Sequence, residues 1–282
     1  MKPERIKPIL KWPGGKFRLL GAILPLLPPG KRLVEPFVGS GAVFMNTDYP
    51  RYLLADINPD LIGFYRSLAD EGKKFIGVCR RLFTAAANAP EAYYRHRQRF
   101  NALPRGQAAT REQMLRRAAL FLYLNRHGYN GLIRYNAGGE FNVPFGRYAR
   151  PYFPAEEMLA FLEKIENAEV EFIAADFRDI LPRVGKGDVA YCDPPYVPLS
   201  ETANFTSYAG NAFVLAEQVE LAGLAEAAGG RDATVVVSNH NSAATRELYR
   251  NAREIHEAEV RRFISCNGGK REMARELLAV YP

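Results

Sequence analysis

Residues 32–60 read RLVEPFVGSGAVFMNTDYPRYLLADINPD and indicate the class of fold. Two short apolar runs, 32–35 and 52–55, are typical of buried strands, and each ends in a turn rich in glycine, proline or asparagine. The residues between them, about 42–47, favour a helix, and Asn58 is a typical N-terminal cap for the next helix. Strands that alternate with helices predict a parallel sheet whose two faces are covered, which is an α/β fold.

The same alternation returns in the second half of the chain, while a helix at 17–27 precedes the first strand. The later strands are expected at 170–174, 189–192 and 234–238, the helices at 156–167 and 213–228, and a terminal β-hairpin at 254–264 with 276–281. The spacing therefore predicts a single sheet assembled from both halves of the chain.

The residues between the two α/β parts have a different pattern. Residues 71–126 show helical patterning rich in arginine, and 131–148 form two alternating runs around Ala137-Gly138-Gly139, which is a hairpin signal. We therefore expect one α/β domain made of 1–66 and 155–282, interrupted by an inserted domain at 67–154.

Charge and cysteine content limit the class of protein. The 282 residues include 38 Lys and Arg against 31 Asp and Glu, which gives a formal net charge of +7 and weakly favours a polyanionic partner. Cys79, Cys192 and Cys266 lie too far apart for a disulfide framework or a zinc site, so we expect free thiols in a reducing cytoplasm. No segment resembles a signal peptide or a membrane span, so we expect neither secretion nor a membrane partner.

The Gly39-Ser40-Gly41 turn lies between a strand and a helix, where glycines let the backbone approach a ligand. A dinucleotide fingerprint would need a third glycine where Phe44 stands. The Gly14-Gly15-Lys16 segment also lacks the first glycine and the hydroxyl residue of a phosphate-binding P-loop.

An acidic residue, Asp56, ends the next strand and is suited to accept hydrogen bonds from ribose hydroxyls. Together with a glycine turn that does not match the phosphate fingerprints, it favours a nucleoside cofactor without pyrophosphate, and S-adenosylmethionine fits. A tight turn and a helix cap without a ligand are the alternatives.

The tetrapeptide Asp193-Pro194-Pro195-Tyr196 directly follows the strand at 189–192. Its prolines fix the backbone and remove two donors, which leaves the carboxylate and backbone carbonyls as acceptors. Such a loop suits an amino group that donates its hydrogens while its nitrogen attacks an electrophile, and Tyr196 offers a face for stacking. A rigid loop without chemistry is the alternative. Cys192 precedes the aspartate at the strand end, so we expect a small buried side chain and not a nucleophile.

These motifs resemble those of the Dam-type DNA adenine-N6 methyltransferases, which methylate adenine in GATC. The resemblance runs nearly end to end and rests on LKWPGGK (10–16), LVEPFVGSGAVF (33–44), LADINPDLI (54–62), LNRHGYNGLIRYN (124–136), GEFNVPFGRY (139–148), YCDPPYVPLS (191–200), TANFTSY (202–208) and SNH (238–240). The cofactor motif comes first, the insertion second and DPPY last, which is the family's α arrangement. The hairpin block is the most specific, because it lies in the part that reads DNA.

The resemblance implies a Rossmann-like S-adenosylmethionine-dependent methyltransferase sheet with a helical and β-hairpin target-recognition insertion. It implies direct methyl transfer to N6 of an adenine flipped out of double-stranded DNA, S-adenosyl-L-methionine as the cofactor, no metal and a monomeric enzyme. We expect it in the bacterial cytoplasm, whether chromosomally or virally encoded.

The family's functional residues map onto this chain in three groups. The catalytic group is Asp193, Pro194, Pro195 and Tyr196. The cofactor group is Trp12, Lys16, Glu35, Pro36, Phe37, Gly39, Ser40, Gly41, Asp56, Asp176, Phe177 and Asp193. The DNA group is Lys11, Tyr129, Asn130, Leu132, Arg134, Asn142, Pro144, Arg147 and Tyr148. Tyr129 and Asn130 would enter the opened duplex, Leu132 would touch a thymine and Arg134 would read a guanine.

Two other functions share some of these features. An RNA or protein-amide N-methyltransferase can use a similar loop, but the hairpin block argues against it. A non-catalytic DNA-binding protein needs neither the DPPY tetrapeptide nor the glycine turn, and both are intact. The polar residues 198–210 after the tetrapeptide hold few apolar anchors, so we expect a mobile loop that closes over the extruded adenine.

Overall fold

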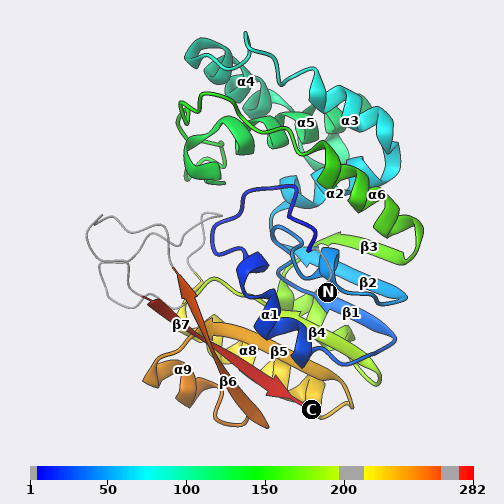
Figure 1. Ribbon diagram of the computed structural model, residues 1–282, viewed down its shortest axis with the longest axis vertical. Coiled ribbons are helices and arrows are strands. Elements are labelled where there is room, and N and C mark those ends of the chain that lie inside the picture. Colours follow the sequence, from blue (N-terminus) through cyan, green and yellow to red (C-terminus); the bar gives the residue numbers. More distant parts are fainter. Residues whose placement is uncertain (1–4, 197–212, 262–272) are drawn as a thin grey trace.

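The computed structural model describes residues 5–196, 213–261 and 273–282, so the predicted loop at 198–210, as well as Cys266, lies outside the described residues. A seven-stranded sheet, in the order β3-β2-β1-β4-β5-β7-β6, lies in the lower half of the molecule as drawn in Figure 1. Neighbours from β3 to β5 pair in parallel, and β7 runs antiparallel to both β5 and β6. The strands are β1 (Arg32–Glu35), β2 (Arg51–Asp56), β3 (Glu169–Ala174), β4 (Asp188–Cys192), β5 (Thr234–His240), β6 (Glu254–Arg261) and β7 (Met273–Tyr281). The predicted α/β fold and its strands are confirmed.

Alternate residues of the central strands point to opposite faces of the sheet, as the two-residue repeat of a strand requires. Leu33 and Tyr52 belong to the apolar cluster on one face, whereas Val34 and Leu53 belong to the cluster on the other. The second cluster is completed by residues of α7 (Phe177–Ile180) and α8 (Leu215–Gly229). Burial on both faces explains why these strands read as continuous apolar runs.

Helix α2 (Pro59–Glu71) begins where the sequence predicts, because the side chain of Asn58 accepts hydrogen bonds from the backbone N–H of Asp60 and Leu61. The helices α6 (Ala155–Glu166) and α9 (Ala243–Leu248) follow later in the chain. The predicted cap and start of α2 are therefore confirmed, and the first turn of α2 lies directly after the end of β2.

The helix expected at 42–47 is wrong in extent. Only a 3-10 turn, η3 (Phe44–Asn46), forms there. The side-chain amide of Asn46 donates to the carbonyls of Ala42 and Ile6, and the hydroxyl of Thr47 donates to the carbonyl of Val43. Side chains therefore bond the carbonyls of Ala42 and Val43, which a longer helix would use. The expected helix at 17–27 is divided into η1 (Lys16–Arg18), α1 (Leu20–Ile23) and η2 (Leu24–Leu26).

The inserted segment contains α3 (Lys73–Arg80), α4 (Pro90–Ala102) and α5 (Arg111–His127), together with the short turns η4 (Gly106–Ala108) and η5 (Tyr129–Gly131). These helices gather at the end of the molecule far from β5, β6 and β7 (Figure 1). Helix α5 packs against α2, and the rings of Phe64 and Phe121 approach to 6.4 Å between centroids. One apolar cluster therefore runs from the sheet into the insertion.

The predicted hairpin at 131–148 reverses direction without a regular ladder. An isolated bridge joins Tyr135 and Phe141 within it, and another joins its Phe145 to Gly128, which precedes the segment. Side chains of α4 bond the backbone instead, because Asn101 accepts from the N–H of Phe141 and donates to its carbonyl, at 2.9 and 3.1 Å. The segment is therefore held by the helix beside it more than by strand pairing.

Candidate active site

Three predicted site segments meet at the carboxyl ends of β1, β2 and β4. The strand order reverses between β1 and β4, which is where open α/β sheets bind ligands. The N–H of Gly39 donates to Asp56 Oδ2 at 3.2 Å. Asp193 lies near enough to Glu35 for its charge to act to raise the pKa of Glu35. The structure thus brings the turn after β1, the acid after β2 and the tetrapeptide after β4 to one edge of the sheet.

The glycine turn after β1 is closely covered by other groups. Gly39 has φ +47°, and a Cβ added there would lie 2.9 Å from Nε1 of Trp12. The hydroxyl of Tyr65 on α2 donates to the carbonyl of Gly39 at 2.9 Å. The indole therefore lies against the turn, so two residues assigned to the cofactor group are in contact.

The carboxylate of Asp56 is fixed from two sides. Its Oδ1 accepts from the N–H of Asn58 at 2.9 Å, and its Oδ2 accepts from Gly39. Burial raises the pKa of Asp56 to about 6, although both backbone hydrogen bonds favour the charged form. The next side chain, Ile57, is 54% exposed and offers an apolar surface beside the acid.

The carboxyl group of Glu35 is buried at the end of β1. The pKa of this carboxyl group is raised to about 8, mainly because the group is buried; a hydrogen bond from the Phe44 backbone acts to lower it, and the nearby charge of Asp193 acts to raise it. Its Oε1 has no hydrogen-bond partner among the described residues. A buried acceptor without a partner is costly, so this oxygen fits a donor supplied by a ligand.

Three aromatic rings, of Phe37, Phe177 and Phe213, pack together beside the carboxyl end of the sheet. The rings of Phe37 and Phe177 stack at 5.5 Å, and the ring of Phe213 meets both at 5.9 and 5.6 Å. Asp176 caps α7 through the N–H of Arg178 and forms an ion pair with that arginine at 3.0 Å. Phe177 belongs to the apolar cluster on this face of the sheet, whereas the carboxylate of Asp176 forms an ion pair with its neighbour Arg178.

The carboxylate of Asp193 is held by two donors on one oxygen. Oδ1 accepts from Lys16 Nζ at 2.8 Å and from the hydroxyl of Ser238 at 3.1 Å. Burial raises the pKa of Asp193, while Lys16, Ser238 and the hydroxyl of Tyr196 act to lower it. The ammonium of Lys16 also donates to the carbonyl of Gly14 at 2.6 Å and lies 4.6 Å from the centroid of the Tyr196 ring.

The ring of Tyr196 is oriented by the antiparallel end of the sheet. Its hydroxyl donates to Glu276 Oε2 on β7 at 2.7 Å, and the ring of His240 on β5 meets it edge to face at 4.5 Å. The carbonyl of Pro195 accepts from Gln218 Nε2 at 2.7 Å. This hydrogen bond ties the backbone of the tetrapeptide to α8 and leaves the carbonyl oxygen a second lone pair.

Several residues of this site were not predicted from the sequence. Ser238, Glu276, Gln218 and Tyr65 come from elements remote in the chain. The SNH block marked Ser238 and His240 as part of the resemblance but gave no role, and nothing in the sequence indicated Glu276 or Gln218. Cys192 is fully buried, and burial raises the pKa of its thiol, which confirms the expected small apolar role.

Lys11, N-terminal to the sheet in the chain, is tied to the inserted segment through Asn125 and Tyr148. Asn125, fully buried on α5, accepts from the N–H of Lys11 at 2.9 Å and donates to its carbonyl and to that of Gly131. The ammonium of Lys11 lies 4.0 Å from the centroid of the Tyr148 ring. The N-terminal segment that carries Lys11 and Trp12 is therefore tied to the start of the segment 131–148.

Most of the other side chains of the DNA group are exposed to solvent. Tyr129 is 52% exposed, and Asn130 has φ 52° at the turn. The exposed Arg134 donates through Nε to Asn142 Oδ1 at 2.8 Å. Pro144 and Arg147 are also exposed, whereas Leu132 is half-buried and packs on the apolar cluster.

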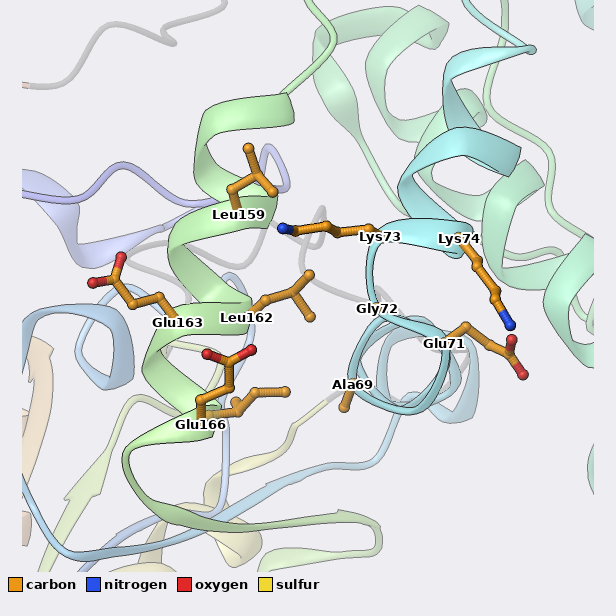
Figure 2. A pocket seen from close by; sticks show the side chains of 10 residues that line it. Ala69, Glu71, Gly72, Lys73, Lys74, Leu159, Leu162, Glu163 and Glu166 are labelled. Carbon is orange, nitrogen blue, oxygen red and sulfur yellow. The ribbon is translucent and has the colours of Figure 1, made fainter.

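A pocket elsewhere on the surface does not belong to this site. It lies between α6 on one side and the end of α2 with the start of α3 on the other (Figure 2). Lys73 extends across it towards Leu159, and Glu163 and Glu166 project from α6. No residue assigned to the cofactor, catalytic or DNA group lines it.

Within residues 5–196, 213–261 and 273–282, no group of three or more His, Cys, Asp and Glu side chains is placed to hold a metal ion. Each helix in the described part of the chain is too short or too polar to cross a bilayer.

The sheet, the glycine turn and the tetrapeptide loop define the class of protein as an α/β methyltransferase with a Rossmann-like sheet. Comparison with known families agrees: the chain belongs to the D12 class N6 adenine-specific DNA methyltransferases, whose family model matches residues 12–264. It is therefore an enzyme that methylates N6 of adenine in DNA, and the resemblance to Dam-type enzymes is confirmed.

Curated relatives match along their whole length. The chain is 50% identical to the DNA adenine methylases of Escherichia coli (strain K12) and Salmonella typhi over 281 residues, which cover 100% of this chain and 96% of each relative. It is 47% identical to the DNA adenine methylase of Serratia marcescens over 282 residues, with 100% of both chains covered.

Proposed function

We propose that this enzyme transfers a methyl group from S-adenosylmethionine to N6 of an adenine flipped out of duplex DNA, within GATC. The observation that carries the proposal is the half-buried Asp193 carboxylate beside the ring of Tyr196. Lys16 and Ser238 bind one oxygen of the carboxylate and favour its charged form, which is the form that accepts hydrogen bonds from an amino group. An adenine stacked on Tyr196 would present its amino group to Asp193.

The cofactor residues have a chemistry that fits S-adenosylmethionine. The unpaired Oε1 of Glu35 suits the ammonium of the amino-acid part, and Asp56 suits the ribose hydroxyls. Ile57 and the rings of Phe37 and Phe177 offer apolar surface for the adenine. When bound, this cofactor supplies an electrophilic methyl group on a sulfonium.

The chain's own residues then position the reacting nitrogen. Asp193 accepts a hydrogen bond from the amino group and offsets the positive charge that grows on nitrogen during transfer. The fixed backbone of the two prolines limits movement of the acceptor, so orientation contributes much of the rate. No covalent bond to the protein is required.

DNA is engaged by the inserted domain, for which we propose the boundaries 67–154. Arg134 has the fork of donors that recognises O6 and N7 of guanine, and Tyr129 is exposed where a flat ring can occupy the space left by the flipped base. Unpairing the adenine costs a few kcal/mol, which contacts made by this domain offset. We propose that a monomer carries the whole site, because one chain supplies the residues of all three groups.

The proposal is tested by DNA protection. DNA from cells that lack adenine methylation but express this protein should resist a GATC-specific nuclease that is blocked by N6-methyladenine. DNA from cells expressing Asp193→Ala at the same level should be cut. Full cutting with the wild-type protein, together with N6-methyladenine found in another sequence, would refute the GATC assignment while leaving the family activity intact.

A further inference from the structure

The carboxylate of Asp60 is buried where the catalytic and inserted parts meet. It lies in the first turn of α2, four residues after Asp56, and its side chain is 4% exposed. Asn58, whose backbone N–H binds Asp56, accepts from the backbone N–H of Asp60 at 3.0 Å. The position of Asp60 is thus set by the same turn that holds the proposed ribose acceptor.

Three side chains converge on this carboxylate, and all come from the insertion. Arg117 on α5 donates through Nε to Oδ1 at 2.5 Å and through Nη2 to Oδ2 at 3.0 Å. The hydroxyl of Tyr135 donates to Oδ2 at 2.7 Å, and Arg105 forms an ion pair at 3.5 Å. Asp60 therefore connects α2 with three separate parts of the inserted segment.

The ion pair between Arg117 and Asp60 already holds the helices together without the hydroxyl of Tyr135. The guanidinium of Arg117 binds both carboxylate oxygens, donates to the carbonyls of Phe100 and Leu103 at 2.6 and 2.9 Å, and lies 4.0 Å from the centroid of the Phe100 ring. These contacts join α2, α4 and α5. The hydrogen bond from the hydroxyl of Tyr135 to Asp60 is not part of this contact between helices, so its role lies elsewhere.

Tyr135 lies in the segment that carries the proposed base reader. It is adjacent to Arg134, whose carbonyl accepts from the N–H of Asn142 at 3.1 Å and whose side chain binds the same residue. The described segment has isolated bridges in place of a ladder, so its position depends on side-chain anchors. The bond to Asp60 ties this segment directly to the catalytic part.

We propose that Asp60 is a positioning residue for sequence discrimination: through Tyr135 it fixes the recognition segment 131–148 relative to the catalytic loop. The inference rests on the proposed function, because it requires that this segment read bases. With the anchor in place, Arg134 meets its base only when the adenine is aligned with Asp193. Without it, the segment shifts, and cognate DNA loses its advantage over substituted DNA.

The variant Tyr135→Phe tests this by removing a single hydroxyl. We expect the ratio of kcat/KM between a GATC duplex and duplexes with one base pair substituted to fall about fivefold, the value of one ordinary hydrogen bond. This fall in the ratio should come from a higher KM for cognate DNA, with kcat and Tm close to those of the wild type. Tyr123→Phe is the matched control, since its buried hydroxyl donates to the carbonyl of Ala87 at 2.6 Å and has no contact with Asp60.

The outcomes are distinguishable. An unchanged ratio in Tyr135→Phe, or an equal fall in Tyr123→Phe, would overturn the positioning role while leaving the proposed function in place. A wild-type enzyme that methylates GATC and substituted duplexes equally well would contradict the proposed specificity and the inference together.

Discussion

The side chain of Asp193 is the group whose loss should affect chemistry most directly. We expect Asp193→Ala to lower the single-turnover methylation rate by about 10²–10³, because the amino group loses its charged acceptor, while DNA affinity changes little. Rapid-quench assays with saturating DNA and cofactor would measure the rate. Asp48→Ala, at an exposed surface carboxylate, is the control. A rate within tenfold of the wild type would remove Asp193 from the mechanism.

The neighbouring Cys192 should be dispensable for chemistry. Its thiol is buried and its pKa is raised, so it is a poor nucleophile. We expect Cys192→Ser to retain methylation within a few-fold and to lose about 1–3 kcal/mol of stability, because a hydroxyl is placed in an apolar site. Methylation assays and urea titrations would show this. A protein–DNA adduct that survives denaturation would contradict direct transfer.

The carboxyl group of Glu35 should make the protein's stability fall as pH rises. Its pKa is about 8 in the folded protein against 4.5 ordinarily, so above pH 4.5 the folded state keeps a proton that the unfolded state has lost. The stabilisation is present at low pH and is lost as pH rises towards 8.

The same shift predicts a specific variant. Because Asp56 titrates at about 6, the decrease between pH 6 and 8 should come mainly from Glu35, and Glu35→Gln should flatten it. Urea titrations of the cofactor-free protein at several pH values would measure this, with Glu156→Gln on the surface as control. An unchanged slope in Glu35→Gln would show that the carboxyl is already ionised at neutral pH.

Among the elements, the turn after β1 requires a residue without a side chain at position 39. Gly39→Ala would place a Cβ against Trp12 in a backbone conformation that only glycine adopts easily, so we expect cofactor affinity to fall at least tenfold. Calorimetric titration would measure the affinity. Gly63→Ala is the matched control, because no atom lies within 4 Å of its added Cβ on α2, and it should raise stability by up to about 1 kcal/mol. Equal affinity in the two variants would mean that the turn does not approach the cofactor.

The elements also show what the sequence could predict. The strands and the cap at Asn58 were predicted because burial and capping leave local patterns of residue type. The helix at 42–47 was wrong because Asn46 binds the carbonyl of Ile6, a partner 40 residues away. Glu276 and Gln218 were missed for the same reason, since their roles depend on β7 and α8 lying beside the tetrapeptide. Whether the mapped residues bind as the resemblance implies stays a prediction.

At the scale of the molecule, the inserted helices and the sheet share one apolar cluster. We therefore expect a single cooperative thermal transition, because neither part buries its apolar surface without the other. Calorimetry, with fluorescence of Trp12 in the catalytic part as a second probe, should give coincident midpoints. Two separated transitions would show instead that the insertion unfolds independently.

The path of that cluster through α2 also limits how such enzymes can exchange specificity. Phe64 on α2 faces Phe121 on α5, and Asp60 on the same helix binds Arg117. A graft of residues 67–154 from a relative would bring a foreign α5 against a resident α2. Recombination, in nature or in the laboratory, should yield working chimaeras only when the crossover lies before residue 59, so that α2 is inherited together with the recognition part.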